Sequence, residues 1–105
     1  EAVAPMDIVV LPLFDKDGMG DLSREIYQSL VSITGLRAEL DTSRSIGRRY
    51  ARADEIGVPW AITIDHESIE DGTVTVRRRD DQRQVRTELG PLLESIAKGT
   101  IDVLF

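Results

Sequence analysis

The chain has 105 residues, of which 41% are hydrophobic and 30% charged, and its formal net charge is −6 at pH 7. These values fit an ordinary soluble globular protein with one core and argue against a generic, highly basic nucleic-acid binder. The absence of cysteine excludes a disulfide framework and a thiolate metal site. A single histidine, His66, excludes a histidine-rich metal or catalytic cluster.

The hydropathy pattern contains no membrane signal. No apolar run approaches the roughly 18 residues that a spanning helix needs, and the N-terminus lacks the basic and apolar regions of a signal peptide. We therefore expect a cytoplasmic protein with no membrane partner. The first residue is Glu1 rather than methionine, which indicates a domain cut from a longer protein. We expect one domain over residues 1–105, with a linker remnant at 1–5.

The first half of the chain follows a β-α-β-α-β pattern. The near-continuous apolar run at 6–14 predicts a central strand covered on both sides. After a loop at 15–20, Asp21 is expected to cap a helix that Gly35 ends. An alternating segment at 36–41 predicts a half-exposed strand. Ser43 or Ser45 would then cap a helix that ends at Gly57, and residues 60–65 form the third strand.

The second half predicts a hairpin and a last helix. The segment 66–72 reads as an acidic turn, followed by a strand at 73–79 and a hairpin partner at 84–89. A helix precedes Gly99, and the apolar end at 101–105 is expected to dock on the body of the domain or on a neighbouring one. The predicted fold is α/β, a three-layer mixed five-stranded sheet flanked by three helices, with a parallel start and an antiparallel finish.

Two groups of arginines are candidates for binding an anion. Arg44, Arg48 and Arg52 lie four residues apart, so they form one stripe along a helix where like charges repel by a few tenths of a kcal/mol. Such a stripe suggests an anionic partner, although ion pairs with Asp54, Glu55 and strand carboxylates would also explain it. The second group, Arg77 to Arg79, has its own alternative, a solvated strand end paired with Asp80 and Asp81.

Signals for catalysis are weak. The sequence has no phosphate-binding loop, no GxGxxG and no GxSxG motif. Glu67, Glu70 and Asp71 could be paired carboxylates or a hard-metal site, but a solvated acidic turn is the favoured interpretation. His66 reads as a loop residue and Trp60 as core. We therefore expect no catalytic site in these residues.

Two consecutive motifs resemble a known family. The segment SIGRRYARADEIGVPWAITID, followed by EDGTVTVRRRDDQRQVR, resembles the C-terminal anticodon-binding domain of class IIa aminoacyl-tRNA synthetases. Within that group it is most similar to glycyl-tRNA synthetases of the archaeal and eukaryotic type. Their pattern is I-G-[KR]-R-Y-x-x-x-D-E-x-G-x-P, a strand, and then D-x-[ST]-V-T-V-R-x-R-D. The resemblance extends over about residues 6–98, and the family fold agrees with the element order above.

The resemblance implies a non-catalytic module that recognises the anticodon stem-loop of tRNA(Gly). The parent enzyme would ligate glycine to its tRNA with ATP and Mg²⁺ in a catalytic domain of the same chain. It would be a homodimer. The residues present here would bind no cofactor. Carried over from related domains, the anticodon-binding residues would be Ser43, Arg44, Glu70, Arg77 and Arg79. Arg48 and Arg52 would hold the tRNA backbone.

One feature departs from many relatives, because Arg78 and Arg79 precede Asp80 and Asp81 and make the hairpin tip more charged. An alternative function is a non-catalytic interaction module of the same fold, such as a polymerase accessory subunit domain that binds protein or nucleic acid. A small free-standing enzyme is the third possibility, supported only by the carboxylates at 67–71. Class II synthetase motifs upstream of Glu1 would favour the anticodon-binding module over both.

Overall fold

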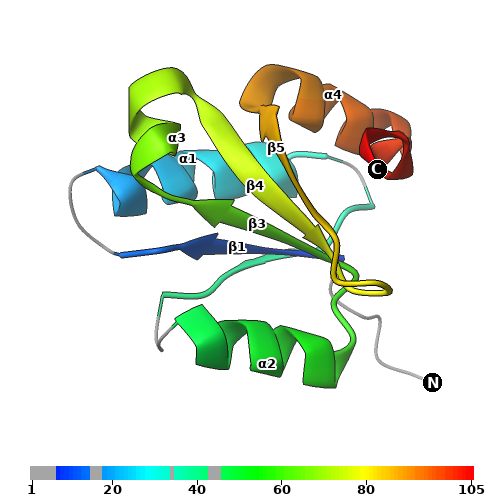
Figure 1. Cartoon of the computed structure of the whole chain (residues 1–105). Helices are drawn as coiled ribbons and strands as arrows, with labels where there is room; N and C mark the ends of the chain where they lie inside the picture. Colours follow the sequence, from blue (N-terminus) through cyan, green and yellow to red (C-terminus); the bar gives the residue numbers. More distant parts are fainter. Residues whose placement is uncertain (1–6, 15–17, 34, 43–45) are drawn as a thin grey trace.

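A mixed sheet organises the computed structural model, which describes residues 7–14, 18–33, 35–42 and 46–105. Within these residues the sheet has five strands in the order β2-β1-β3-β4-β5 (Figure 1). The strands are β1 (Ile8–Pro12), β2 (Ala38–Leu40), β3 (Trp60–Ile64), β4 (Thr73–Arg78) and β5 (Gln84–Glu88). β1 pairs in parallel with β2 and β3, whereas β4 is antiparallel to both β3 and β5. The predicted parallel start and antiparallel finish are confirmed.

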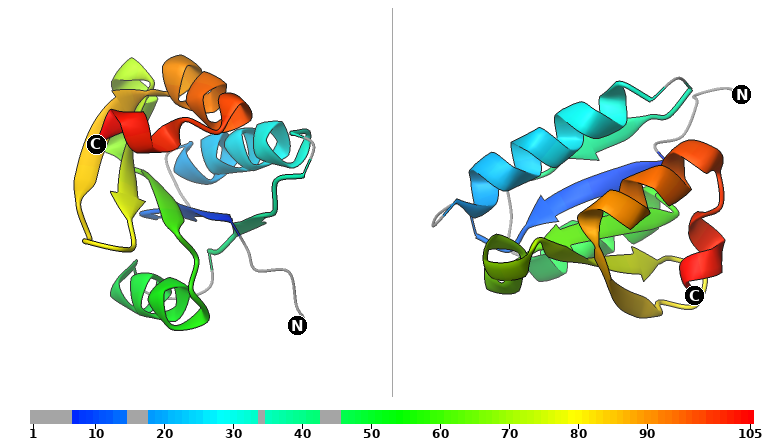
Figure 2. Two further views of the ribbon diagram at one scale, coloured as in Figure 1. Left: turned by 90° about the vertical axis from the view of Figure 1, so that its right-hand side faces the viewer. Right: turned by 90° about the horizontal axis from the view of Figure 1, so that it is seen from above.

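Helices cover both faces of the sheet. They are α1 (Met19–Val31), α2 (Ile46–Ile56), α3 (His66–Asp71), α4 (Leu89–Lys98) and a short 3-10 helix, η1 (Ile101–Leu104). Figure 2 shows α1 and α4 side by side on one face, with α2 alone on the other. The three layers are as predicted. None of the helices in the described ranges is long and apolar enough to cross a membrane.

The core is divided by the sheet into two clusters. The larger lies under α1 and α4 and contains Val10, Ile62 and Val76, each fully buried. The smaller lies under α2 and contains Val9, Leu11 and Ala61 among its buried residues. Successive residues of a strand point to opposite faces. Because apolar residues fill both faces of β1, this strand has no polar side, as its sequence predicts.

Two sequence predictions about helices are wrong. The expected acidic turn at 66–72 is the helix α3, so the described residues contain four α-helices rather than three. A capping box starts α3: the Asp65 carboxylate accepts from the Ser68 backbone N–H at 3.1 Å, and the Ser68 hydroxyl accepts from the Asp65 N–H at 3.0 Å. Asp21 does not cap α1, because this helix begins at Met19 after Gly18 in a left-handed conformation. The caps expected at Ser43 or Ser45 lie outside the described residues.

The C-terminal end packs on the body of the domain, which confirms one of the two expectations for it. Ile101 is buried in the larger cluster, and Leu104 and Phe105 pack against that cluster. The Phe105 ring lies 5.5 Å from that of Trp60 between centroids, and the Arg78 guanidinium lies 4.7 Å from the Phe105 centroid. Trp60 is only partly buried, because it sits where β3 begins at the edge of the core.

Candidate functional site

One part of the sheet carries polar side chains on the same side as α2. Residues directly opposite each other in a sheet project to the same face. Ala61, under α2, is paired with Arg77, and Arg77 is paired in turn with Gln84. We call this surface of β4 and β5 the polar sheet face. Its residues are Thr73, Thr75, Arg77, Gln84, Arg86 and Glu88.

Arg77 lies at the border between the polar sheet face and α2. Its guanidinium carbon is 4.9 Å from the centroid of the Tyr50 ring on α2, a cation–π distance, and the residue is only 9% exposed. The Tyr50 hydroxyl shares a short hydrogen bond with the Thr63 hydroxyl on β3. Arg77, a predicted anticodon-binding residue, is therefore held against an aromatic ring and presents little surface to a partner. Its position suits it to supporting a neighbouring contact.

Arg86 joins the polar sheet face to α3. It donates to the Thr73 hydroxyl at 2.6 Å, forms a short ion pair with Asp65, and lies 3.9 Å from the Glu67 carboxylate. The Thr73 hydroxyl in turn donates to the Asp71 carboxylate at 2.6 Å, which lowers the pKa of Asp71. Sequence reasoning overlooked Arg86. The alternation of exposed Gln84, Arg86 and Glu88 along β5 was the signal that could have revealed it.

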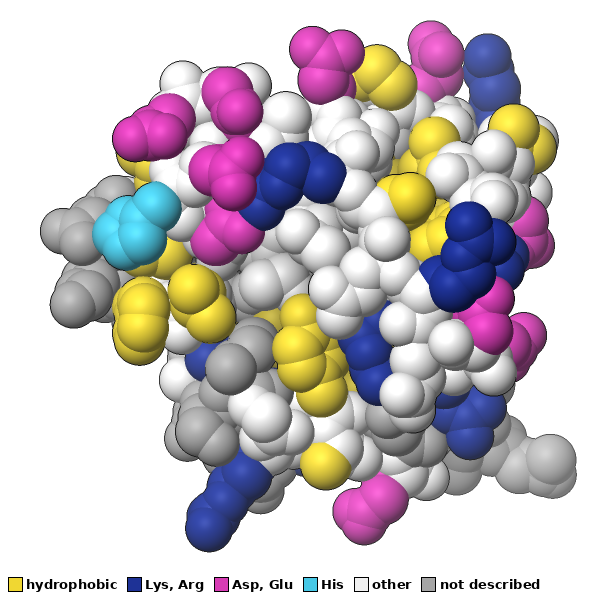
Figure 3. All heavy atoms as spheres, in the orientation of Figure 1, with side chains coloured by type: hydrophobic (Ala, Val, Ile, Leu, Met, Phe, Trp, Pro, Cys, Tyr) yellow, Lys and Arg dark blue, Asp and Glu magenta, His cyan; other side chains and the backbone are white. Residues whose placement is uncertain are grey.

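Glu70 and Arg79 lie at opposite ends of β4. Glu70 is exposed on α3, just before the strand, and Figure 3 shows acidic side chains gathered near that helix. Arg79 is exposed just after the strand, where its backbone N–H donates to the Pro59 carbonyl at 2.9 Å. A strand rises about 3.3 Å per residue, so the six residues of β4 place these two predicted contacts about 20 Å apart. The structure does not bring them together.

Arg48 and Arg52 are the two arginines of α2 that are predicted to contact the tRNA backbone. Arg48 is exposed on α2. Arg52 pairs with Glu39 at 2.7 Å and with Asp41 at 3.5 Å, both near β2. The hydrogen bond to Glu39, together with its charge, raises the pKa of Arg52. Ion pairing with strand carboxylates was the alternative explanation for the arginine stripe, and Arg52 forms such ion pairs. Ser43 and Arg44, the other predicted contacts, lie outside the described residues.

A buried arginine that no sequence pattern distinguishes from its neighbours fixes α2 to the sheet. Arg49 is 4% exposed, and it donates to the carbonyls of Pro12 at 2.6 Å and Asp41 at 2.9 Å. It thereby joins the first turn of α2 to the ends of β1 and β2. Its Nε has no hydrogen-bond partner within the described residues. Burial and carbonyl contacts indicate that Arg49 has a structural role.

The described residues contain no group of three or more histidine, aspartate or glutamate side chains placed to hold a metal ion. Two of the carboxylates near α3 are engaged with protein groups. Asp65 binds Ser68 and Arg86, and Asp71 binds the hydroxyl and backbone N–H of Thr73. The chemistry that the site offers is hydrogen bonding and charge, supplied by guanidinium, hydroxyl and carboxylate groups along β4 and β5.

Comparisons with known proteins place the chain in a family. The model of the anticodon binding domain matches residues 7–99. A glycine–tRNA ligase of Methanothermobacter thermautotrophicus is 52% identical over 96 residues, which cover 91% of this chain and 17% of the ligase. A glycine–tRNA ligase of Methanothrix thermoacetophila is 51% identical over 86 residues, covering 82% of this chain and 15% of the ligase. The chain thus spans only about a sixth of these relatives.

The fold is similar to that of a solved structure of an RNA-binding domain. The RNA binding domain of threonyl-tRNA synthetase from Cryptosporidium parvum superimposes with a TM-score of 0.79 at 18% identity. The match covers 90% of this chain and 24% of that chain. At this identity the likeness establishes the arrangement of strands and helices, and the sequence matches above carry the family assignment.

Proposed function

The chain belongs to the anticodon-binding-domain family and is homologous to part of glycine–tRNA ligases, and we propose that it recognises the anticodon stem-loop of tRNA(Gly). The observation that carries the proposal is the polar sheet face, where the exposed Arg86 binds the Thr73 hydroxyl and lies near Glu67 of α3, the helix that also carries the exposed Glu70. Proteins read single-stranded RNA loops by hydrogen-bonding to base edges and by stacking bases on planar groups. Guanidinium, hydroxyl and carboxylate groups supply both kinds of contact.

Glu70 is the proposed base reader at the α3 end. Glycine anticodons contain two adjacent cytosines, and a carboxylate can accept a hydrogen bond from the exocyclic amine of cytosine. The side chain is exposed and stands on a helix whose N-terminus is fixed by Asp65 and Ser68. A rigid support for an exposed acceptor suits discrimination between bases.

Arg79 is proposed to contact a different nucleotide, because about 20 Å separates it from Glu70 along β4. Arg77, proposed as an anticodon-binding residue, would act mainly by holding Tyr50 and the sheet in position, since it is only 9% exposed. Ser43 and Arg44 keep their proposed role beside the anticodon. Arg48 and Arg52 would bind the phosphate backbone, and Arg52 would do so while paired with two carboxylates.

The parent protein is proposed to be a cytoplasmic, homodimeric glycine–tRNA ligase. Its catalytic domain, in the same chain, would use ATP and Mg²⁺ to activate glycine, and the present residues would carry no cofactor. The homology to glycine–tRNA ligases over 91% of this chain supports the proposal. The role of this module would be to raise the affinity for the correct tRNA and so to lower KM for it.

The test is to replace the two exposed candidates separately in the full-length ligase, as Glu70→Ala and Arg79→Ala. We expect each change to weaken aminoacylation of tRNA(Gly) by about tenfold, mainly through KM, because a lost base contact costs about 1–3 kcal/mol. Glycine activation, measured by ATP–pyrophosphate exchange, should be unchanged. Glu94→Ala is the matched control, since Glu94 is exposed on α4 and pairs only with Lys98 in the described contacts. Unchanged charging kinetics for both variants would exclude these residues as anticodon readers.

A further inference from the structure

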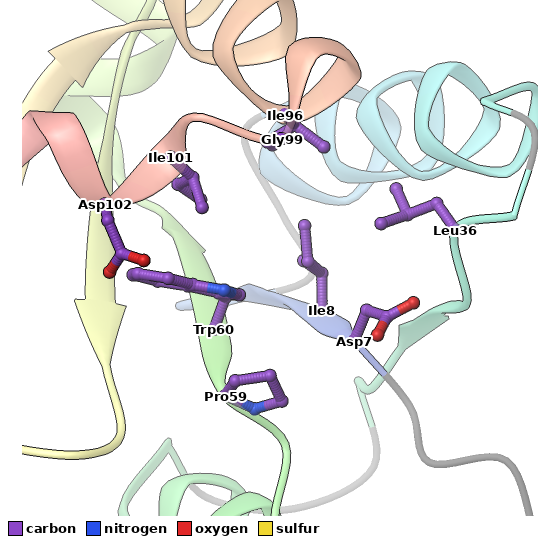
Figure 4. Close-up of a pocket in the computed structure, with 9 residues that line it drawn as sticks. All are labelled: Asp7, Ile8, Leu36, Pro59, Trp60, Ile96, Gly99, Ile101 and Asp102. Carbon is purple, nitrogen blue, oxygen red and sulfur yellow. The ribbon is translucent and has the colours of Figure 1, made fainter.

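A pocket lies on the far side of the sheet from the polar sheet face. Its volume is about 330 Å³, and it opens where β1 and β3 begin, between the loop after α1 and the end of α4 (Figure 4). Ile8 and Trp60 are the first residues of these strands; Ile8 belongs to the larger core cluster under α1 and α4, and Trp60 packs against that cluster. The pocket therefore shares neither a face nor a strand end with Glu70 or Arg86.

The lining of the pocket combines an apolar base with a charged rim. Ile8, Ile96 and Ile101 line it and are at least nine-tenths buried. The charged residues among those that line it are Asp7 and Asp102, which Figure 4 shows on either side of Trp60 and Ile8. An aromatic ring flanked by two carboxylates offers a cation both a π face and charged acceptors.

The carboxylates of Asp7 and Asp102 can each accept a further hydrogen bond. Asp7 accepts from the Arg37 backbone N–H at 2.9 Å, and Asp102 lies 3.4 Å from Arg78, which is bound more closely by Asp81 at 2.6 Å. An ionised carboxylate has two oxygens and about four acceptor positions, so neither contact saturates it. The Asp102 side chain is also 76% exposed.

We propose that this pocket is a docking site for an arginine side chain presented by a partner polypeptide. Guanidinium is planar, stacks on indole and binds carboxylates through paired N–H groups, whereas a lysine ammonium is a compact point charge. The volume suits one long side chain with part of an apolar neighbour rather than a whole helix. A phosphate backbone is the wrong partner, because the two carboxylates would repel it. The proposal is independent of tRNA recognition.

The test uses the intact chain and the fluorescence of Trp60, its single tryptophan. The probe is the peptide acetyl-Leu-Arg-Leu-amide, with a citrulline peptide as the neutral isostere and a glutamate peptide as the charge reversal. We expect saturable quenching by the arginine peptide and about tenfold weaker binding of the citrulline peptide, since a charge-assisted hydrogen bond is lost. The glutamate peptide should not bind. Nuclear magnetic resonance should show shifts at the Trp60 indole N–H and the methyl groups of Ile96 and Ile101.

Two conservative variants and a control locate the binding. Asp7→Asn and Asp102→Asn should each weaken binding of the arginine peptide by about threefold or more, because the amide keeps the shape of the carboxylate and loses its charge. Asp80→Asn, an exposed carboxylate in the turn between β4 and β5, should leave binding unchanged. Equal affinity for the arginine and citrulline peptides, absence of binding, shifts away from the pocket, or no effect of either pocket variant would overturn the proposal. A tRNA anticodon stem-loop should not displace the peptide.

Discussion

Tyr50 joins three elements through one side chain. Its ring lies 4.9 Å from the Arg77 guanidinium on β4, and its hydroxyl shares a hydrogen bond with Thr63 on β3. The ring and the hydroxyl therefore have separable functions. The ring supports the arginine at the border of the polar sheet face, and the hydroxyl fixes α2 to the sheet.

Tyr50→Phe separates these two functions. We expect the free energy of unfolding to fall by about 1 kcal/mol, because one hydrogen bond is lost and the buried Thr63 loses its partner on α2. Binding of an anticodon stem-loop should be unchanged, since the ring remains beneath Arg77. Urea unfolding and RNA titration measure the two quantities.

Tyr27→Phe is the control for this change, because Tyr27 is a half-buried tyrosine on α1, across the sheet. Loss of RNA binding by Tyr50→Phe, or a stability equal to that of the unmodified chain, would contradict the separation of ring and hydroxyl.

The burial of Arg77 was beyond sequence reasoning. Strand alternation correctly placed Arg77 on the opposite face from Arg78. The depth of its burial depends on Tyr50, which lies 27 residues earlier in the chain and reaches β4 only because α2 crosses that face. A pattern within one strand carries no information about a side chain that another helix supplies. The same limit explains why Arg49 was not singled out.

At the scale of elements, the strands and helices with long apolar patterns were predicted correctly, whereas a short polar helix was not. β1 is identified by five consecutive buried residues, and α2 by its apolar spacing and Gly57. α3 has six residues, too few for a periodic pattern, and its stability depends on the capping box at Asp65 and the link to Arg86. The start of α1 was misplaced because Gly18, in a left-handed conformation, precedes it in place of a side-chain cap.

The β4–β5 hairpin contains an ion pair with a defined pH dependence. Arg78 donates to Asp81 at 2.6 Å, and this hydrogen bond lowers the pKa of Asp81 from its ordinary value of 3.8 to about 2. A carboxyl whose pKa is depressed by folding contributes stability that is fully present above the unfolded pKa. That contribution is lost as pH falls through the folded pKa. The relevant window is therefore pH 4 to 2.

Asp81→Asn should remove this contribution. We expect the difference in unfolding free energy between the unmodified chain and Asp81→Asn to be constant above pH 4 and to shrink as pH falls toward 2. Urea unfolding at half-unit pH steps measures it. Asp80→Asn, at the neighbouring exposed carboxylate, provides the comparison for a general loss of surface charge. A difference that does not change with pH would show that the hydrogen bond is absent in solution.

At the scale of the whole molecule, the negative net charge opposes RNA binding, whereas arginines gathered near β4, β5 and α2 favour it. The chain carries −6 overall, yet eleven arginines are distributed so that several of them border β4, β5 and α2. Many of these guanidinium groups are already paired: Arg52 with Glu39, Arg78 with Asp81, and Arg86 with Asp65. The charge available to phosphates is therefore much smaller than the arginine content suggests.

This distribution predicts weak, salt-sensitive binding of an anticodon stem-loop by the isolated chain. We expect a dissociation constant in the micromolar range or weaker, because few phosphate contacts form against an unfavourable net charge. Each phosphate contact contributes about 0.7–0.9 to the slope of log K against log salt, so Arg48→Ala should reduce the slope by about that amount. Arg52→Ala should reduce the slope by less than one full phosphate contact, since Arg52 is paired with Glu39 and Asp41. Fluorescence anisotropy at several salt concentrations measures these slopes. Nanomolar, salt-insensitive binding would contradict the prediction of weak, salt-sensitive binding.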